Sequence, residues 1–258
     1  MIVRISSVKL IRSMDLIQSV VRSVYFVVVV MIVYMSICRK CAAKRKRQNI
    51  RGDPMIFLYS GTPGSGKSLH VAERLYHLLR AGRPTVCNFP INLNRIPKKK
   101  RELFCYKSNL EITPDFLIEF SREHFKGKKV KESSLLLVID ECQLMFNARD
   151  WSKSGRDKWL SFFTLHRHYG YDIILVAQFD RMIDRQIRSL IEYEYIHRKV
   201  SNFGLRGMLL CAVMLSPKLF VSVKVWYPMK EKVSSEFFKC KRKYYSLYDT
   251  YLMLDAPE

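Results

Sequence analysis

The feature that most constrains the fold of this chain is a glycine-rich octapeptide. It comprises Gly61, Thr62, Pro63, Gly64, Ser65, Gly66, Lys67 and Ser68. The octapeptide fits the phosphate-binding pattern G-x-x-x-x-G-K-[ST], and it lies between an apolar run at 55–59 and helix-compatible sequence at 69–81. Glycines let backbone N–H groups approach phosphate oxygens, and the positive end of the following helix favours the same anion. We therefore expect this loop to cradle a nucleotide, with Lys67 at the β- and γ-phosphates and the Ser68 hydroxyl on Mg²⁺.

A second segment, which is acidic, supplies the expected Mg²⁺ ligand and catalytic carboxylate of such a nucleotide site. The apolar run at 135–139 ends in Asp140 and Glu141. Asp140 is expected to hold Mg²⁺ through water or Ser68, and Glu141 to polarise a water that attacks the γ-phosphate. A glutamate beside the aspartate fits water as the acceptor, which favours an ATPase over a small-molecule kinase. Gln178 follows the apolar run at 173–177 and is expected to face the γ-phosphate, with a capping or loop glutamine as the alternative.

Apolar runs alternate with helical patterns along residues 55–190, which predicts an α/β fold with a parallel sheet. Expected strands lie at 55–60, 85–88, 135–139 and 173–177, and expected helices at 69–81, 115–123 and 158–168. Beyond residue 191 the pattern changes, and 191–200 and 219–226 are expected to form two longer strands. The apolar stretch at 208–215 is too short to cross a bilayer.

The N-terminal part is apolar from residue 24 to 38, and extension to Leu16 gives about 20 residues, enough for a membrane span. A buried strand and a cleaved signal peptide are the alternatives. A dense basic cluster follows residue 39 and is expected to stay in the cytoplasm. The predicted organisation is a tail and transmembrane helix at 1–39, a basic linker at 40–54, a P-loop NTPase domain at 55–230 and a basic tail at 231–258.

The charge balance is strongly positive, with 45 Lys and Arg against 23 Asp and Glu, a formal net charge of +22. This surplus favours polyanions, either nucleic acid or an anionic membrane face. Basic loops at 98–101 and 126–131 are candidates for contact with DNA phosphates. The 7 cysteines lack a repeated ligand spacing, which indicates reduced thiols in a cytosolic compartment; a zinc site at the lone C-x-x-C of 38–41 is the alternative. Candidate arginine fingers are Arg149, Arg156, Arg167, Arg181, Arg185 and Arg188.

Several segments together resemble the zonular occludens toxin (Zot) domain, a family similar to the inner-membrane assembly ATPase of filamentous phages. They are the phosphate loop, Asp140 to Gln143, Trp159, residues 166–178, and residues 192–195 with His197 and Arg198. The resemblance covers about 55–230 and is most specific at 140–178. It implies a P-loop NTPase fold with an additional strand between the two Walker strands. It also implies that Lys67 and Ser68 bind nucleotide and Mg²⁺, and that Asp140 and Glu141 form the Walker B pair.

The resemblance further implies ATP-driven assembly and export of filamentous virions through the host envelope. Family members typically carry their membrane span after the ATPase domain, whereas the candidate span here precedes it. We therefore expect a single-pass ATPase motor of the host inner membrane, working as a homo-oligomer with its ATPase domain in the cytoplasm. Its expected partners are phage coat and assembly proteins, the membrane, and single-stranded DNA at the basic loops. The alternatives are a nucleotide-gated, non-catalytic scaffold for virion assembly and a small-molecule or nucleotide kinase.

Overall fold

The structure, a computed structural model, describes residues 55–147 and 155–248. The span expected within residues 1–39, and the linker at 40–54, lie outside this range. Among the described residues, no helix has both the length and the apolar character needed to cross a bilayer.

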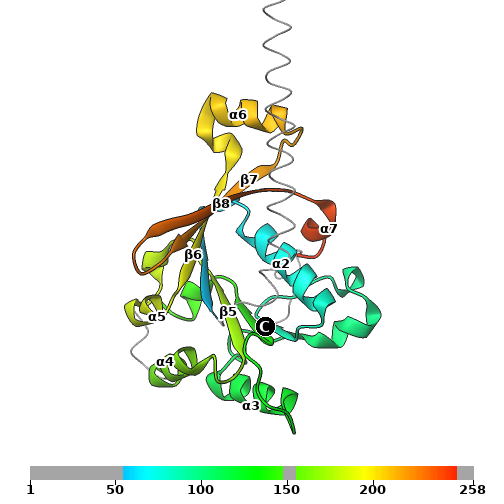
Figure 1. Ribbon diagram of the computed structural model, residues 1–258, viewed down its shortest axis with the longest axis vertical. Coiled ribbons are helices and arrows are strands. Elements are labelled where there is room, and N and C mark those ends of the chain that lie inside the picture. Colours follow the sequence, from blue (N-terminus) through cyan, green and yellow to red (C-terminus); the bar gives the residue numbers. More distant parts are fainter. Residues whose placement is uncertain (1–54, 148–154, 249–258) are drawn as a thin grey trace, which may run out of the picture. The chain divides into compact units, whose positions relative to one another are not determined.

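An eight-stranded sheet forms the centre of the described part (Figure 1). The strands are β1 (Ile56–Ser60), β2 (Thr85–Cys87), β3 (Phe104–Tyr106), β4 (Leu135–Ile139), β5 (Tyr171–Val176), β6 (Tyr193–Lys199), β7 (Leu219–Trp226) and β8 (Glu231–Lys239). The α-helices are α2 (Lys67–Ala81), α3 (Pro114–His124), α4 (Arg156–Leu165), α5 (Arg185–Ser189), α6 (Gly204–Val213) and α7 (Arg242–Tyr245). Short 3₁₀ turns are η1 (Leu93–Arg95), η2 (Lys98–Leu103), η3 (Cys142–Leu144), η4 (Asp180–Met182) and η5 (Val200–Phe203).

The strand order is β3-β2-β4-β5-β1-β6-β7-β8, and every pairing from β3 to β6 is parallel. Strand β5 therefore lies between β1 and β4, as expected for an additional strand between the Walker strands. Because parallel strands end at the same edge of a sheet, the segments that follow β1, β4, β5 and β6 emerge together. This edge is where ligands bind in open α/β sheets.

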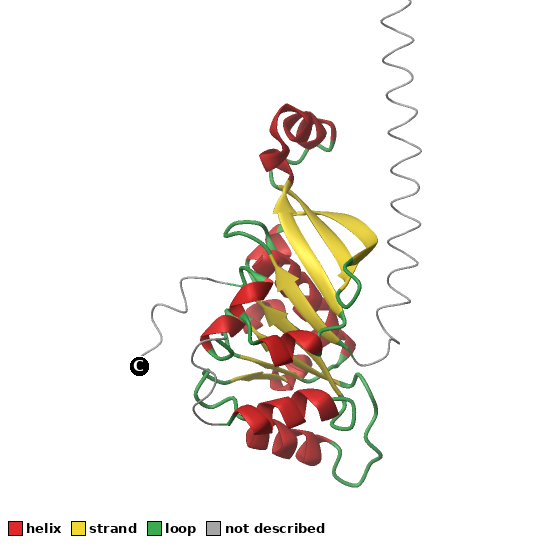
Figure 2. Cartoon of the chain, turned by 90° about the vertical axis from the view of Figure 1, so that its left-hand side faces the viewer, coloured by secondary structure: helices red, strands yellow, loops and turns green. Residues whose placement is uncertain are grey.

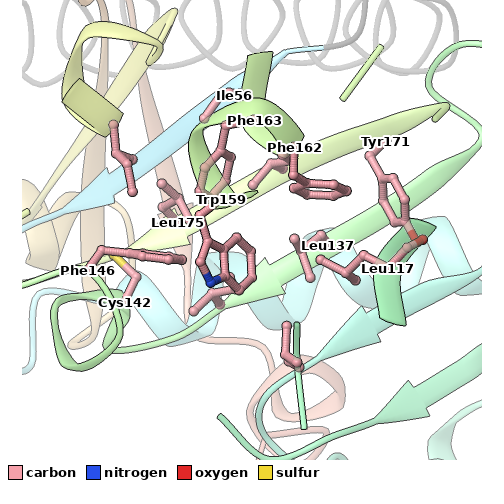
Figure 3. Packing of buried hydrophobic residues seen from close by; sticks show 14 of the residues in the cluster. Ile56, Leu117, Leu137, Cys142, Phe146, Trp159, Phe162, Phe163, Tyr171 and Leu175 are labelled. Carbon is pink, nitrogen blue, oxygen red and sulfur yellow. The ribbon is translucent and has the colours of Figure 1, made fainter. Parts of the chain in front are cut away.

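Both faces of the sheet are covered, because successive residues of a strand point to opposite sides. Ile56 and Leu58 of β1 pack in one apolar cluster with residues of α3, α4 and α5. Phe57 and Tyr59 pack in a second cluster with α2 and α7. Figure 3 shows the first cluster, in which Trp159, Phe162 and Phe163 of α4 lie against the sheet. Burial on both faces explains the apolar runs of β1, of β4 and of residues 173–176 in β5.

Several segments differ from the sequence-based expectation. Residues 231–239, assigned to a basic tail, form strand β8, which pairs antiparallel with β7. The basic segment at 98–101, expected to be a loop, lies in the 3₁₀ turn η2. The two longer strands expected at 191–200 and 219–226 are present as β6 and β7, which pair antiparallel, and the unexpected elements η5 and helix α6 connect them.

Candidate functional site

The phosphate loop, residues 61–66, joins the buried strand β1 to helix α2. Gly66 caps α2 with φ 94°, a left-handed conformation that favours glycine. A Cβ on Gly66 would lie 2.8 Å from the ring of Phe220, and a Cβ on Gly61 would lie 2.5 Å from the His197 carbonyl oxygen. The base of the loop is therefore packed too tightly for side chains. At its crest, Gly64 has open space around it.

Lys67 is the first residue of α2, and its side chain reaches back to the start of the loop, with only 8% of its surface exposed. Its Nζ donates hydrogen bonds to the carbonyl oxygens of Gly61 at 2.6 Å and Thr62 at 3.4 Å. Burial lowers the pKa of the Lys67 ammonium, while the carboxylates of Glu141 and Asp140 act in the opposite direction. The ammonium is thus within electrostatic reach of the acidic tip of β4.

Asp140 follows β4 directly and is buried. Its Oδ1 accepts a 2.9 Å hydrogen bond from the Glu141 N–H. Asn88, just after β2, fixes the backbone: its Oδ1 accepts from the Asp140 N–H at 2.7 Å, and its Nδ2 donates to the Asp140 carbonyl at 2.8 Å. Burial raises the pKa of the Asp140 carboxyl, and a hydrogen bond from Tyr248 opposes this shift. The carboxylate is therefore held in a defined position at the sheet edge.

Glu141 has a left-handed backbone, with φ 45° and ψ 44°. Its carboxylate accepts a short hydrogen bond from Gln143 Nε2. A non-glycine residue in this region is uncommon and marks a strained position, which often coincides with function. This left-handed conformation turns the chain sharply at the tip of β4, between the buried Asp140 and the 3₁₀ turn η3.

Ser68 and Asp140, the two expected Mg²⁺ ligands, lie on either side of the Tyr248 hydroxyl. Tyr248 O–H donates a 2.6 Å hydrogen bond to Asp140 Oδ2, and the Ser68 side chain acts on the same hydroxyl in the direction that lowers the pKa of Tyr248. Ser68 and Asp140 thus both lie next to the Tyr248 hydroxyl.

Gln178 follows β5 and contacts the phosphate loop through its main chain. Its carbonyl oxygen accepts a 3.1 Å hydrogen bond from the Gly61 N–H. Gln178 also lines a cavity of about 560 Å³ beside the loop. The other lining residues come from the start of the loop, the segment after β5, the end of β6 and η5: Ser60, Gly61, Thr62, Phe179, Asp180, Glu194, Ile196, His197, Arg198, Lys199, Asn202 and Phe203.

The residues of the loop fit a nucleoside triphosphate with Mg²⁺. Ser65 is 2% exposed, and its Oγ is a buried hydroxyl for which the described residues provide no hydrogen-bond partner. The open space at Gly64 and the Lys67 ammonium belong to the same octapeptide. An anion bound here would take up these donors. Within the described ranges, no cluster of three or more His, Cys, Asp or Glu side chains could hold a metal ion on its own.

Sequence reasoning did not identify Asn88, Tyr248 or the histidine pair beside the loop. His197 is 1% exposed; its Nδ1 lies 3.2 Å from the Ser60 carbonyl oxygen and its Nε2 lies 2.8 Å from His70 Nδ1. Because a carbonyl oxygen only accepts, His197 Nδ1 carries the proton and Nε2 accepts from His70. Burial lowers the pKa of His197 to about 4.

Two of the candidate arginine fingers form ion pairs within the chain. Arg167 Nη2 lies 2.9 Å from Glu192 Oε1, and Arg156 Nη2 lies 3.8 Å from Asp184 Oδ2. Arg149 lies outside the described residues.

The phosphate loop and the acidic tip of β4 lie within a region shared with a known family. The sequence profile of zonular occludens toxin (Zot) matches residues 55–251, most of the chain. This chain belongs to the Zot family. The Zot match includes β8, α7 and Tyr248, so the matched region extends past the boundary at residue 230 that the sequence analysis predicted.

Individual relatives of this chain include phage proteins. The Gene 1 protein of Enterobacteria phage fd is 28% identical over 208 residues, which cover 76% of this chain and 59% of that protein. The chain spans between 39% and 59% of the length of the curated relatives it matches.

Two solved structures are similar to the structure of this chain. The N-terminal domain of zonular occludens toxin from Neisseria meningitidis is 19% identical, with a TM-score of 0.47, and covers 77% of this chain and 100% of that domain. The ATPase domain of another protein has a TM-score of 0.52 at 8% identity, covering 78% of this chain and 87% of that domain. The latter likeness supports the P-loop NTPase fold alone.

Proposed function

We propose that this Zot-family protein is a Mg²⁺-dependent ATPase that drives the assembly and export of filamentous phage. The observation that carries the proposal is the convergence of Lys67, Ser68 and Asp140 at one sheet edge, where Asp140 accepts a hydrogen bond from Tyr248 and Ser68 acts on the same hydroxyl. Homology to phage Gene 1 proteins supports the biological setting.

Each residue of the site has a defined task in this proposal. The backbone N–H groups of residues 61–66 and the Lys67 ammonium bind the β- and γ-phosphates. Ser68 and Asp140 hold Mg²⁺, which when bound neutralises charge that develops on the phosphate oxygens. Glu141 accepts hydrogen bonds at the tip of β4 and polarises water for attack on the γ-phosphate. Gln178, tied to Gly61 through its carbonyl, orients that water or detects its consumption.

Turnover of ATP by the full chain tests the enzymatic part of the proposal. Lys67→Ala removes the phosphate-binding ammonium, and we expect loss of both nucleotide binding and hydrolysis. Glu141→Gln keeps the shape of the side chain but not its basicity, so turnover should fall by about 10²–10⁴-fold while binding of a fluorescent ATP analogue persists. The matched controls are Lys129→Ala and Glu132→Gln in an exposed loop, which should retain wild-type turnover.

If wild-type turnover equals that of Lys67→Ala while the wild type still binds the ATP analogue, the chain is not an ATPase. The nucleotide-gated scaffold for virion assembly would then be the correct function. Phosphate transfer to an organic acceptor in place of water would identify a kinase.

The cellular setting is a second part of the proposal. Residues 1–39 anchor the chain as a single pass in the host inner membrane, residues 40–54 link the anchor to the ATPase domain, and that domain lies in the cytoplasm as part of a homo-oligomer with phage coat and assembly proteins. The basic flank after residue 39 supports this orientation. In right-side-out membrane vesicles, external protease should leave residues 55–248 intact, and cleavage there before lysis would contradict the topology.

A further inference from the structure

Helix α6 exposes apolar side chains over its outer face, at the far end of β6 and β7. We call residues 203–215 the apolar tip. Leu205 is 77% exposed, Met208 and Leu209 are each 61% exposed, and Leu215 is 92% exposed. Figures 1 and 2 both show α6 beyond the ends of these strands, away from α3 and α4. A large apolar surface rarely faces water in a folded protein without a partner.

The packing of α6 against the end of the sheet determines which of its residues point outward. Cys211 is buried in a small cluster with Val200, Leu219 and Val221, separate from the two clusters that cover the main sheet. Gly207 permits the close contact, because a Cβ there would lie 2.0 Å from the Val200 carbonyl oxygen. Among the described side chains of α6, those on the inner face and those on the outer face are both apolar, which is typical of a helix that is buried in a protein core or in a membrane.

Positive charge surrounds the apolar tip. Every formal charge in the sequence between Glu194 and Glu231 is positive. Arg198 before the tip and Lys218 after it are exposed. Lys239 of β8 donates a 2.7 Å hydrogen bond to the Met214 carbonyl oxygen at the end of α6. An apolar surface with a cationic border is complementary to an anionic membrane surface, because the apolar side chains can contact acyl chains while the cations contact lipid phosphates.

We propose that the apolar tip inserts into the surface of an anionic lipid bilayer. At 10 residues, α6 is about 15 Å long, half the hydrocarbon thickness of about 30 Å, so it lies in the interface and does not span it. A symmetric contact with a second copy is disfavoured because it would bring the same cations, Arg198 and Lys218, together from both subunits. The insertion goes beyond the proposed ATPase function, since it needs neither nucleotide nor the anchor at residues 1–39.

Depth-dependent fluorescence quenching tests this contact in the full chain. An environment-sensitive fluorescent amino acid replaces Leu209, and the protein is reconstituted with vesicles of phosphatidylethanolamine and phosphatidylglycerol that carry a nitroxide on the upper acyl chain. Insertion by about 5–10 Å should bring the label to the nitroxide and quench it by roughly half or more. The matched control carries the label at Leu110, which is 91% exposed on the turn after β3, at the other end of the strand order, and should remain unquenched.

A second variant, Met208→Glu with Val213→Glu, adds negative charge to two exposed positions of the tip and should abolish quenching at position 209. Its thermal unfolding transition should match that of the parent, since neither side chain is buried. The proposal is overturned if position 209 stays unquenched, if position 110 is quenched equally, or if vesicles of phosphatidylcholine alone quench as strongly. It is also overturned if the label at 209 becomes shielded without vesicles as protein concentration rises, because that result identifies a second copy as the partner.

Discussion

The Tyr248 hydroxyl donates a hydrogen bond to Asp140 and lies next to Ser68. Mg²⁺ held by Ser68 and Asp140 would have to displace this hydroxyl, so we expect Tyr248 to compete with the metal. Tyr248→Phe removes the hydroxyl and keeps the ring contact with Phe89. Because one hydrogen bond contributes about 1 kcal/mol, we expect the variant to bind Mg²⁺–nucleotide about fivefold more tightly in a titration with a fluorescent analogue.

Phe89→Leu, which alters the ring contact but not the hydroxyl, is the control for that titration and should leave the affinity unchanged. Weaker nucleotide binding by Tyr248→Phe would mean that the hydroxyl holds the nucleotide and does not compete with the metal.

The sequence predicted some residues of the candidate site and missed others for a physical reason. Lys67 and Ser68 belong to a local pattern, because a phosphate loop is built from consecutive residues. Asn88 contacts Asp140 across 52 residues of sequence, and Tyr248 does so across 108. Such contacts exist only once the sheet has brought the segments together, and neither residue type carries a local signal for them.

At the scale of elements, strands buried on both faces were easier to predict than edge strands. The structure confirms strands at the apolar runs 55–60 and 135–139, which form β1 and β4, and at 173–176, which forms most of β5. Strand β8 was missed because it is the edge strand, and its exposed positions carry glutamate and lysine that resemble a solvated tail. Helix α6 was missed because a largely apolar segment, in which Arg206 is the one charged residue, has no helical periodicity to detect.

His197 joins three elements, since it lies on β6 and bonds to β1 through Ser60 and to α2 through His70. Burial holds its folded-state pKa at about 4, below the ordinary 6.5. The unfolded chain therefore binds a proton at higher pH than the folded chain does, and the free energy of unfolding should fall as pH drops from 6.5 towards 4. The full effect is on the order of 3 kcal/mol.

Urea unfolding at several pH values, compared between the wild type and His197→Asn, measures this contribution. The variant should lose part of the pH dependence, whereas His168→Asn, at an exposed position, should retain it. Identical pH profiles for wild type and His197→Asn would exclude His197 as the source.

For the whole molecule, the charge surplus of +22 should govern binding to single-stranded DNA. Lys98 and Lys99 in η2 are exposed. Each cation that contacts a phosphate adds about 0.7 to the slope of log K against log salt for a single strand, so Lys98→Gln with Lys99→Gln should reduce the slope by about 1.4. Fluorescence anisotropy over a salt series measures the slope.

Lys232→Gln with Lys241→Gln removes the same charge from exposed positions elsewhere and is the control for the DNA measurement. An equal loss of slope in both double variants would show that net charge alone, and no particular surface, binds DNA.

The pairing of β1 with β5 and β6 has a consequence for the biosynthesis of this protein. Ser60 Oγ of β1 donates its hydrogen bond to Glu194, which lies 134 residues later. A nascent chain that has exposed only the octapeptide lacks both neighbours of the strand that carries it, and long-range pairing of this kind forms slowly. We expect ribosome-bound fragments that end before β6 to be unable to retain ATP, so nucleotide binding would begin only after β6 has left the ribosome.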